Sequence, residues 1–498
     1  MKMIRNICIY LILCFLLSIM ISCAGDNGTA GTVETTSFVS KSDVIEVSDT
    51  TRIDPGLPDE IRYDGYEFRV LTKGQTNVHW KSFDIAADEI NGEPLNDAVY
   101  NRNMVINEKY GVTVVDIPGN YSNLAGDALK AITAGDDAYD MLCFQAASLI
   151  TDGYLVNLYE IPYMNLDQPY YDQNIIESFT ILGKLYAVTG DMLTMDNDAT
   201  WCVQFNKKIA EDLSFETIYG KSMYDIVDEG KWTMDLLYET ARLAINDVNG
   251  DGVMTELVDV WGYQTQNQNT YMMFAGSGEV IARVRSDGYP QITLSSDRVM
   301  SVLEKAIGFQ IDKETGMNAD FITGYADVWG EVMDGNFQQS LALYNIAGLN
   351  RVTLFRAMEV DFGILPLPKY DENQDSYYSS VVIGCANYIT IPKTATDLER
   401  TGIIIEALSC ESKYTVLPAY YDNTLKTKAS RDEESSAMLD LIFATTVFDI
   451  GEFFSWGGIH GTISNMKDPG KIASTLATAE TNINTQMEKT ITAIEENS

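Results

Sequence analysis

Short β-rich runs alternate with amphipathic helical segments at the start of this chain, and this alternation limits its fold more than any other feature. Helices are indicated by apolar residues three and four positions apart, and strands by short β-branched and aromatic runs. Strands that alternate with helices predict a sheet with crossover connections, which is the α/β class. The predicted order is strand 67–72, helix 97–110 ended by Gly111, strand 112–116, helix 124–134 and strand 139–144.

The chain is long enough for more than one core. Its 498 residues indicate two or three domains, or one fold of two lobes. Hydrophobic residues make up 46% and aromatic residues 10%, so the bulk of the chain can fold. Further along, the pattern predicts helices at 233–245 (with Thr233 as N-cap), 298–310, 396–409 and 435–446, and a strand at 362–365.

The chain is strongly acidic. It has 34 Lys and Arg against 72 Asp and Glu, which gives a formal net charge of −38. A surface of this charge repels phosphate backbones and anionic lipid headgroups. We therefore expect no nucleic-acid partner.

Residues 1–22 have the pattern of a signal peptide. Basic residues precede an uncharged run at 7–21, which as a helix would span only about 22 Å and is too short for a bilayer core. A small residue then precedes Cys23, which resembles the lipobox of bacterial lipoproteins, with Met20 where leucine is usual. The resemblance implies that Cys23 becomes the acylated N-terminus, with a thioether-linked diacylglycerol and an amide-linked chain such as palmitate. Ordinary cleavage and release is the alternative.

Residues 23–59 predict a flexible tether. They are rich in Ser, Thr and Gly and contain a single aromatic residue, Phe38, so they cannot bury enough apolar surface to order themselves. With an acylated Cys23, we expect a protein that is anchored by lipid to the extracytoplasmic face of the bacterial cell membrane and does not span it.

Five segments in a fixed order resemble a known family. They are Gly183–Val188 (GKLYAV), Trp201–Lys208 (WCVQFNKK), Gly230–Thr233 (GKWT), Asp334–Leu341 (DGNFQQSL) and Phe362–Lys369 (FGILPLPK). After a lipoprotein signal, this order is similar to that of extracellular solute-binding proteins of ABC sugar importers, the maltose-binding-protein-like family. The resemblance covers about residues 60–460.

That family resemblance implies an α/β, two-lobed periplasmic-binding-protein-like fold (type II) with hinge crossovers. It implies a monomer that captures a carbohydrate, which we expect to be an oligosaccharide, and delivers it to the permease of an ABC transporter. A binding protein for a non-sugar solute such as a peptide is the alternative. The implied lobes are 60–192 plus 362–415 for lobe one and 193–361 plus 416–498 for lobe two.

Ligand-facing residues are expected beyond the carboxyl ends of the strands, in the crevice between the lobes. Sugars need aromatic faces for their C–H surfaces, and amides or carboxylates for their hydroxyls. Core packing is the alternative for each tryptophan, and Trp232 is expected to be structural. Tyr414, Tyr420 and Tyr421 fit either the rim or the packing of the return helices. The candidates are His79, Trp80, Gln145, Asp198, Trp201, Asn345, Glu452 and Trp456.

The segment DVNGDG at 247–252 resembles a calcium loop. It places oxygen ligands at loop positions one, three and five and a turn glycine at six. Val258 stands where an acidic residue is usual, and a polar Asp/Asn/Gly turn is the alternative. The predicted structural Ca²⁺ ligands are Asp247, Asn249, Asp251, the Val253 carbonyl, and Glu256 or Asp259.

Enzyme function has little support in the sequence, and we expect none. The chain has two histidines, His79 and His460, and no GxSxG, HExxH or P-loop motif. Its many acids leave a glycan-acting hydrolase with a carboxylate pair open. A structural or adhesive surface lipoprotein also stays open, although no repeat is present. The cysteines at 143, 202, 385 and 410 lack zinc spacing and stand among apolar neighbours, so we expect buried free thiols.

Overall fold

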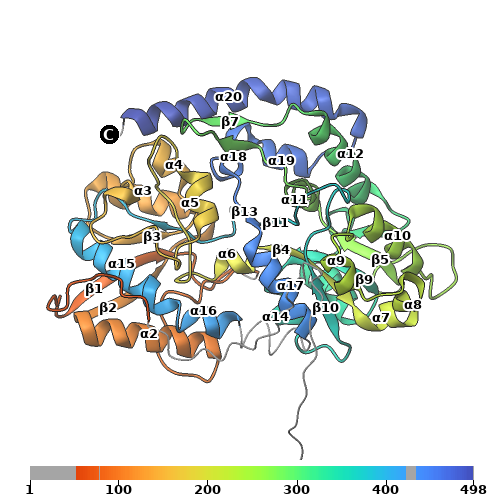
Figure 1. Cartoon of the computed structure of the whole chain (residues 1–498), viewed down its shortest axis with the longest axis horizontal. Coiled ribbons are helices and arrows are strands. Elements are labelled where there is room, and N and C mark those ends of the chain that lie inside the picture. Colours follow the sequence, from red (N-terminus) through yellow and green to blue (C-terminus); the bar gives the residue numbers. More distant parts are fainter. Residues whose placement is uncertain (1–51, 78, 422–432, 497–498) are drawn as a thin grey trace, which may run out of the picture. The chain divides into compact units, whose positions relative to one another are not determined.

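The first sheet holds the strands predicted near the start of the chain (Figure 1). In this computed structural model, which describes residues 52–77, 79–421 and 433–496, β1 (Tyr66–Thr72) pairs in parallel with β2 (Val112–Pro118) and β3 (Met141–Cys143). β12 (Ile389–Thr390) pairs antiparallel to β3, so the strand order is β12-β3-β1-β2. The α/β prediction is confirmed.

Helical crossovers connect these strands as predicted. α2 (Pro94–Tyr110) links β1 to β2, and Gly111 ends it with a φ of 69°, a conformation that favours glycine. α3 (Leu124–Ala134) links β2 to β3 and buries Leu124, Ala128 and Ile132, which lie four residues apart. α15 (Leu398–Ser412) is largely buried and packs against α2.

The second sheet has the order β10-β4-β9-β5-β8 (Figure 1). β9 is parallel to β5, and β5 to β8, whereas β4 is antiparallel to both β9 and β10. Thr233 caps α10, as predicted, by accepting a hydrogen bond from the Leu236 amide. The strands are β4 (Trp201–Asn206), β5 (Trp261–Thr265), β8 (Gly316–Asn318), β9 (Ala342–Gly348) and β10 (Phe362–Leu365).

Helices and two small sheets make up much of the rest of the described chain. α20 packs against α4, α12 and the short turn η6. The longer helices are α10 (Met234–Ala244), α12 (Asp297–Ile311), α17 (Glu433–Ala444) and α20 (Ile472–Glu496). The shorter ones are α4 (Ala147–Thr151), α5 (Gln173–Phe179), α6 (Met195–Asp198), α7 (Lys207–Asp212), α8 (Phe215–Tyr219), α9 (Met223–Asp228), α11 (Asn269–Gly276), α13 (Gly335–Gln338), α14 (Asn350–Phe355), α16 (Val416–Pro418), α18 (Ile450–Phe453), α19 (Ile459–Ser464), a π-helix η4 (Trp329–Asp334) and η6 (Trp456–Gly458). Two small sheets pair β6 (Ala282–Val284) with β7 (Pro290–Ile292) and β11 (Ser379–Ser380) with β13 (Thr446–Val447).

Two features differ from the sequence prediction. Residues 362–365, assigned to lobe one, form β10 and pair with β4 in the second sheet, so the chain rejoins the first sheet only at β12. The predicted tether is wrong for residues 53–59, because apolar side chains there reach the core. The Ile53 amide donates to the Tyr414 hydroxyl at 2.8 Å, and Leu57 is buried.

The structure does not test the other predictions for the N-terminal region. The signal peptide at 1–22, Cys23 and the tether up to residue 51 lie outside the described residues. Within the described residues, no helix combines the length and apolar character that crossing a membrane requires. None of the four cysteines in the described residues forms a disulfide, and three are buried and Cys385 is partly buried, which agrees with the expected thiols.

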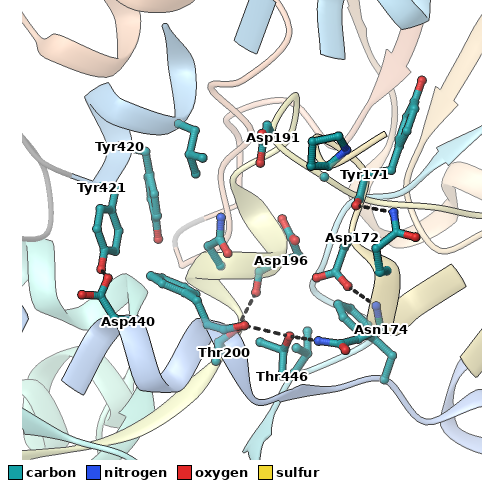
Figure 2. Close-up of a pocket in the computed structure, with 18 residues that line it drawn as sticks. Tyr171, Asp172, Asn174, Asp191, Asp196, Thr200, Tyr420, Tyr421, Asp440 and Thr446 are labelled. Atoms are coloured by element: carbon teal, nitrogen blue, oxygen red, sulfur yellow. Dashed lines mark hydrogen bonds between the residues drawn. The ribbon is translucent and has the colours of Figure 1, made fainter. Parts of the chain in front are cut away.

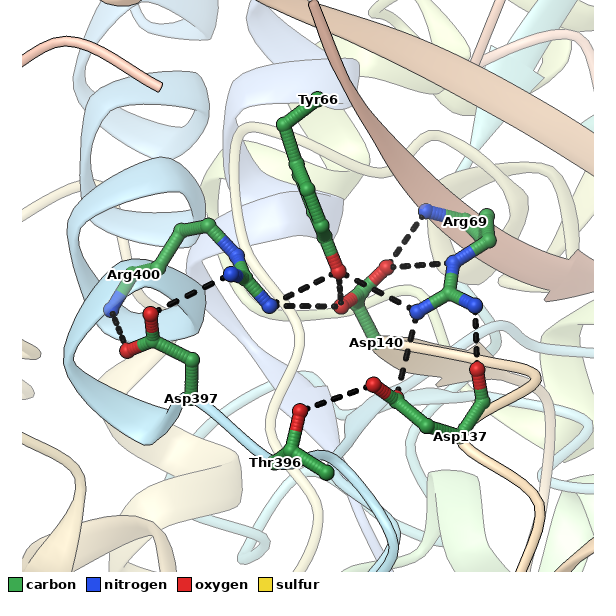
Figure 3. Close-up of polar contacts among 7 residues, drawn as sticks. All are labelled: Tyr66, Arg69, Asp137, Asp140, Thr396, Asp397 and Arg400. Atoms are coloured by element: carbon green, nitrogen blue, oxygen red, sulfur yellow. Dashed lines mark hydrogen bonds and ion pairs between the residues drawn. The ribbon is translucent and has the colours of Figure 1, made fainter. Parts of the chain in front are cut away.

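An ion cluster fixes the edge of the first sheet to α15 (Figure 3). Asp140 is fully buried and accepts hydrogen bonds from the Tyr66 hydroxyl at 2.5 Å and from the Arg69 amide and Nε at 2.8 and 3.1 Å. Arg400, on α15, places its guanidinium 3.7 Å from the same carboxylate and over the Tyr66 ring. Asp140 is therefore buried with two cations supplied by the chain itself.

Candidate ligand-binding site at the strand ends

The carboxyl ends of β1, β2 and β3 open onto a cavity of about 260 Å³. Lys73, directly after β1, is buried and donates to the carbonyls of Cys385 and Ala386 at 2.6 and 2.8 Å. Burial lowers the pKa of Lys73 to about 8. Because its protons are directed at backbone carbonyls, Lys73 holds the loop after β1 against the segment before β12.

Gln145 and Tyr121 form the polar and aromatic walls of this cavity. Gln145 follows β3, where the sequence placed a ligand contact, and its amide nitrogen donates to the Phe453 carbonyl of α18. Tyr121 follows β2 and is only partly buried, and burial raises its pKa. The strand ends thus combine an amide and an aromatic ring that keeps part of its surface exposed.

The loop after β1 also contacts residues that follow β8 and β9 of the second sheet. His79 Nε2 lies 3.2 Å from an Asp327 carboxylate oxygen, and Arg351 nitrogens lie 3.3 Å from His79 Nδ1. Because an arginine can only donate, His79 Nδ1 is the acceptor in this contact, and Nε2 faces the Asp327 carboxylate. Asn350 adds a 3.3 Å bond from its amide to the His79 carbonyl.

Arg351 connects this contact to a buried acid. Its guanidinium pairs with Asp334 at 3.2 Å, and the Asp334 side chain is only 5% exposed. Burial raises the pKa of Asp334 to about 6, and the Arg351 charge acts in the opposite direction. The contacts of Arg351 with His79 and with Asp334 therefore connect the loop after β1 to a buried acid of η4.

Aromatic surface accompanies these polar groups. Trp80 is partly buried and packs at the edge of the core, and Trp329 is 38% exposed with its ring edge-on to His79 at 6.2 Å. Flat aromatic faces beside amide, carboxylate and guanidinium groups suit a neutral ligand with many hydroxyls, since its C–H surface can stack while its hydroxyls form hydrogen bonds.

Five of the predicted ligand residues lie elsewhere in the structure. Strand β4 is buried along its whole length, so Trp201 points into protein, not into a cleft. Trp201 donates to Asn269, Asn345 is bonded to Gln204 and Gln264, and Trp456 is 1% exposed, donates to Thr490 and stacks on Phe454. Asp198 is partly buried and accepts from Tyr420, and Glu452 is 5% exposed and precedes Phe453, whose carbonyl Gln145 contacts.

Burial also explains the electrostatics of the last two residues. It raises the pKa of Asp198 to about 7, and it raises the pKa of Glu452 well above the ordinary value, with the Asp449 charge acting in the same direction. Trp232, expected to be structural, is fully buried and donates to the Pro366 carbonyl. Of the predicted ligand residues, Gln145 lines the cavity at the strand ends, and His79 and Trp80 lie in the loop after β1.

Sequence reasoning missed the residues that face them. Asp327 and Trp329 belong to the run YADVWGEVMDG, which ends at the landmark beginning with Asp334. A tryptophan among acids directly before that landmark was the signal that the sequence offered. Arg351 had none, because only the pairing of β9 brings α14 beside the loop after β1.

The predicted calcium loop is closed by its own backbone amides. Asp247 accepts from Gly250 and Gly252 at 2.7 Å each, and the buried Asp259 accepts from Val248 and Thr255 at 2.8 and 2.7 Å. No three His, Cys, Asp or Glu side chains in the described part of the chain converge at metal-holding spacing. Calcium at this loop stays a prediction.

No protein-family model matches the chain. No curated protein matches its sequence. Several solved structures share its fold. The Listeria monocytogenes ABC substrate-binding protein Lmo0181, in complex with cycloalternan, superposes with a TM-score of 0.54 at 15% identity, covering 85% of this chain and 100% of that one.

Two further structures agree with this likeness. A cyclo/maltodextrin-binding protein complexed with maltotetraose gives a TM-score of 0.53 at 15% identity over 86% of this chain and 96% of its own. The galacto-N-biose/lacto-N-biose I-binding protein of Bifidobacterium longum gives 0.53 at 12% identity over 85% and 97%. At these identities the likeness establishes the fold, which is the two-lobed, type II periplasmic-binding-protein-like fold of ABC-importer sugar-binding proteins.

Proposed function

We propose that this chain captures a carbohydrate at the strand-end site and delivers it to the permease of an ABC importer. The observation that carries the proposal is the set of residues at the strand ends. Tyr121 and Gln145 line the cavity at the strand ends, and Trp80 and Trp329 offer partly exposed aromatic surface at the contact of His79 with Asp327, in a fold whose solved examples hold oligosaccharides. An oligosaccharide suits these separated aromatic surfaces better than a single sugar ring.

The proposed mechanism is binding coupled to closure, with no bond made or broken in the ligand. His79 already links the loop after β1 to Asp327 and Arg351, which follow β8 and β9 of the second sheet. A ligand that contacts both sides stabilises the closed arrangement only by its differential affinity for it. The Lys73 contacts with the segment before β12 would hold one wall in place.

Membrane attachment through Cys23 is part of the proposal. The support is the sequence alone: a short apolar signal run and a small residue before the cysteine. Two acyl anchors would hold the protein at the extracytoplasmic face of the membrane. Cys23→Ala should abolish incorporation of a labelled fatty acid in cells, and unchanged labelling in this variant would refute lipidation.

A thermal-shift screen of linear oligosaccharides, peptides and polyamines tests the function. A ligand at 100 times its dissociation constant adds about 2.7 kcal/mol to the free energy of unfolding. We expect oligosaccharides to stabilise the chain, and Trp80→Ala and Trp329→Ala each to weaken binding about tenfold or more. Tyr163→Ala, which removes a 41% exposed ring away from the strand ends, is the matched control. Stabilisation by peptides alone, or turnover of a glycoside, would overturn the proposal.

A further inference from the structure

A second cavity, of about 480 Å³, lies apart from the strand-end site (Figure 2). Figure 2 shows Tyr420, Tyr421 and Asp440 on one side and Tyr171 and Asp172 on the other, with Asp196 between them. These residues come from the segments around 170–200 and 417–448, far apart in the sequence. Its volume is within the usual range for small-molecule sites.

The lining of this cavity is rich in carboxylates. Asp172, Asp191, Asp196 and Asp440 all line it, and no Lys, Arg or His is among its described lining residues. Lys413 pairs with Asp191 at 3.4 Å, and Asp172 accepts from the amides of α5. The Tyr421 hydroxyl donates to Asp440, whereas no cation of the described residues pairs with Asp196, so a cationic ligand group would find its partner at this carboxyl.

Asp196 is the buried acceptor of the cavity. Asp196 is only 6% exposed, and its Oδ1 has no hydrogen-bond partner among the described residues. Burial, followed by the charge of Asp172, raises the pKa of Asp196 well above the ordinary value; the nearby Thr189 hydroxyl opposes the rise, although it too is without a hydrogen-bond partner. A buried carboxylate oxygen without a donor is costly unless a ligand supplies one.

Aromatic rings form a further part of the lining. Tyr420, Tyr421, Phe443 and Phe448 line the cavity, and the Tyr421 and Phe443 rings contact each other at 5.7 Å. Aromatic faces attract ammonium groups, and the attraction grows when the cation leaves water. A single metal ion fits less well, because in the described residues no three acidic, His or Cys side chains approach closely enough to share one.

We infer that this cavity binds a small aliphatic amine or diamine, with an ammonium group donating to Asp196 and lying against the aromatic wall. This second site does not depend on the proposed carbohydrate function. The ligand proposed for this cavity is a cation, whereas the carbohydrate proposed for the strand ends is uncharged.

Isothermal titration of the purified chain with putrescine, butylamine and 1,4-butanediol tests the inference. Putrescine and butylamine should bind, the uncharged diol should not, and Asp196→Asn should weaken amine binding about tenfold or more, equivalent to about 1.4 kcal/mol. Phe443→Leu keeps an apolar side chain but removes the ring, so it should weaken binding severalfold even if Asp196→Asn fails to fold. Asp235→Asn, whose side chain is 76% exposed, controls for total charge and should bind like the wild type.

Three outcomes would overturn the second site. The first is the absence of amine binding to the wild type. The second is equal amine affinity in the wild type and in folded Asp196→Asn and Phe443→Leu variants. The third is loss of amine binding in Trp80→Ala, which would place the amine at the strand ends. Binding of calcium chloride but of neither amine would identify a metal site in its place.

Discussion

Two buried aspartates, Asp140 and Asp196, lie in opposite electrostatic surroundings. Asp140 is fully buried, and Arg69, Arg400 and the Tyr66 hydroxyl surround its carboxylate (Figure 3). Asp196 is almost as deeply buried, yet its neighbours in the cavity include further acids, and its Oδ1 has no donor in the described chain. The chain has a net charge of −38, so basic side chains are few relative to acidic ones. A buried acid such as Asp140 that is paired with arginines stabilises the fold, whereas one without a cationic partner, such as Asp196, can bind a cationic ligand.

The comparison predicts that substitutions in the two clusters have opposite signs. Removing one partner of a buried ion pair leaves an uncompensated charge and destabilises the fold. Removing a buried charge that has no partner relieves a cost already present. Burial alone therefore does not say whether an acidic residue stabilises this protein.

Arg69→Met should give the largest effect. Arg69 donates to Asp140 at 3.1 Å and also contacts Asp137, so its loss should lower the free energy of unfolding by about 3 kcal/mol. Arg62→Met is the control, because Arg62 and Asp64 are 51% and 77% exposed and such pairs contribute about 1 kcal/mol at most. Urea unfolding measures both. Equal losses in the two variants would remove the distinction between buried and exposed pairs.

Asp196→Asn should act in the opposite direction, and more strongly at higher pH. An unfolded aspartate titrates near about 3.9, whereas burial raises the pKa of Asp196 in the folded chain. The folded state then holds a proton that the unfolded chain has lost, so this residue's contribution to stability falls as the pH rises through the folded pKa. The variant lacks this loss and should gain about 1 kcal/mol relative to the wild type between roughly pH 5 and 8.

Urea unfolding of both proteins at the two pH values checks this gain. Asp191, whose pKa burial raises to about 6, titrates in both proteins and largely cancels in the difference. Asp235→Asn should show the same difference from the wild type at both pH values, since its side chain is exposed. A pH-independent difference for Asp196→Asn would mean that the folded cavity does not alter the protonation of this carboxyl.

The sequence predicted helices more accurately than ligand-facing residues. Local patterns suffice for helices: α3 begins and ends where its apolar spacing and Gly135 indicate. The rule that ligands lie beyond strand ends led to Gln145, which closely follows β3, and to His79, in the loop after β1, and their ligand contacts stay a prediction. Trp201 failed the same reasoning, because β4 is buried on both faces and an aromatic residue there packs into the core.

Contacts between distant segments could not be predicted. Arg400 reaches Asp140, and Asp440 shares a cavity with Asp196, only after the whole chain has folded. The sequence left Tyr420 and Tyr421 open between rim and packing, and the structure places both in the wall of that cavity. The composition shows that basic residues are few, but only the folded structure shows which carboxylates pair with them.

In the Asp247 loop, acidic side chains accept hydrogen bonds from backbone amides. Chelation of calcium at this loop should change stability less than the substitutions above. Asp251 is exposed and Asp247 is partly exposed, and backbone amides of Gly250, Gly252 and Val253 donate to them. If calcium also binds, it offsets repulsion among acids that water already screens, so EDTA should lower the melting temperature by only a few degrees and leave oligosaccharide affinity unchanged. Asp251→Ala should reproduce the chelator's effect. If EDTA has no effect and calorimetry detects no calcium binding, the loop is a polar turn closed by its own amides.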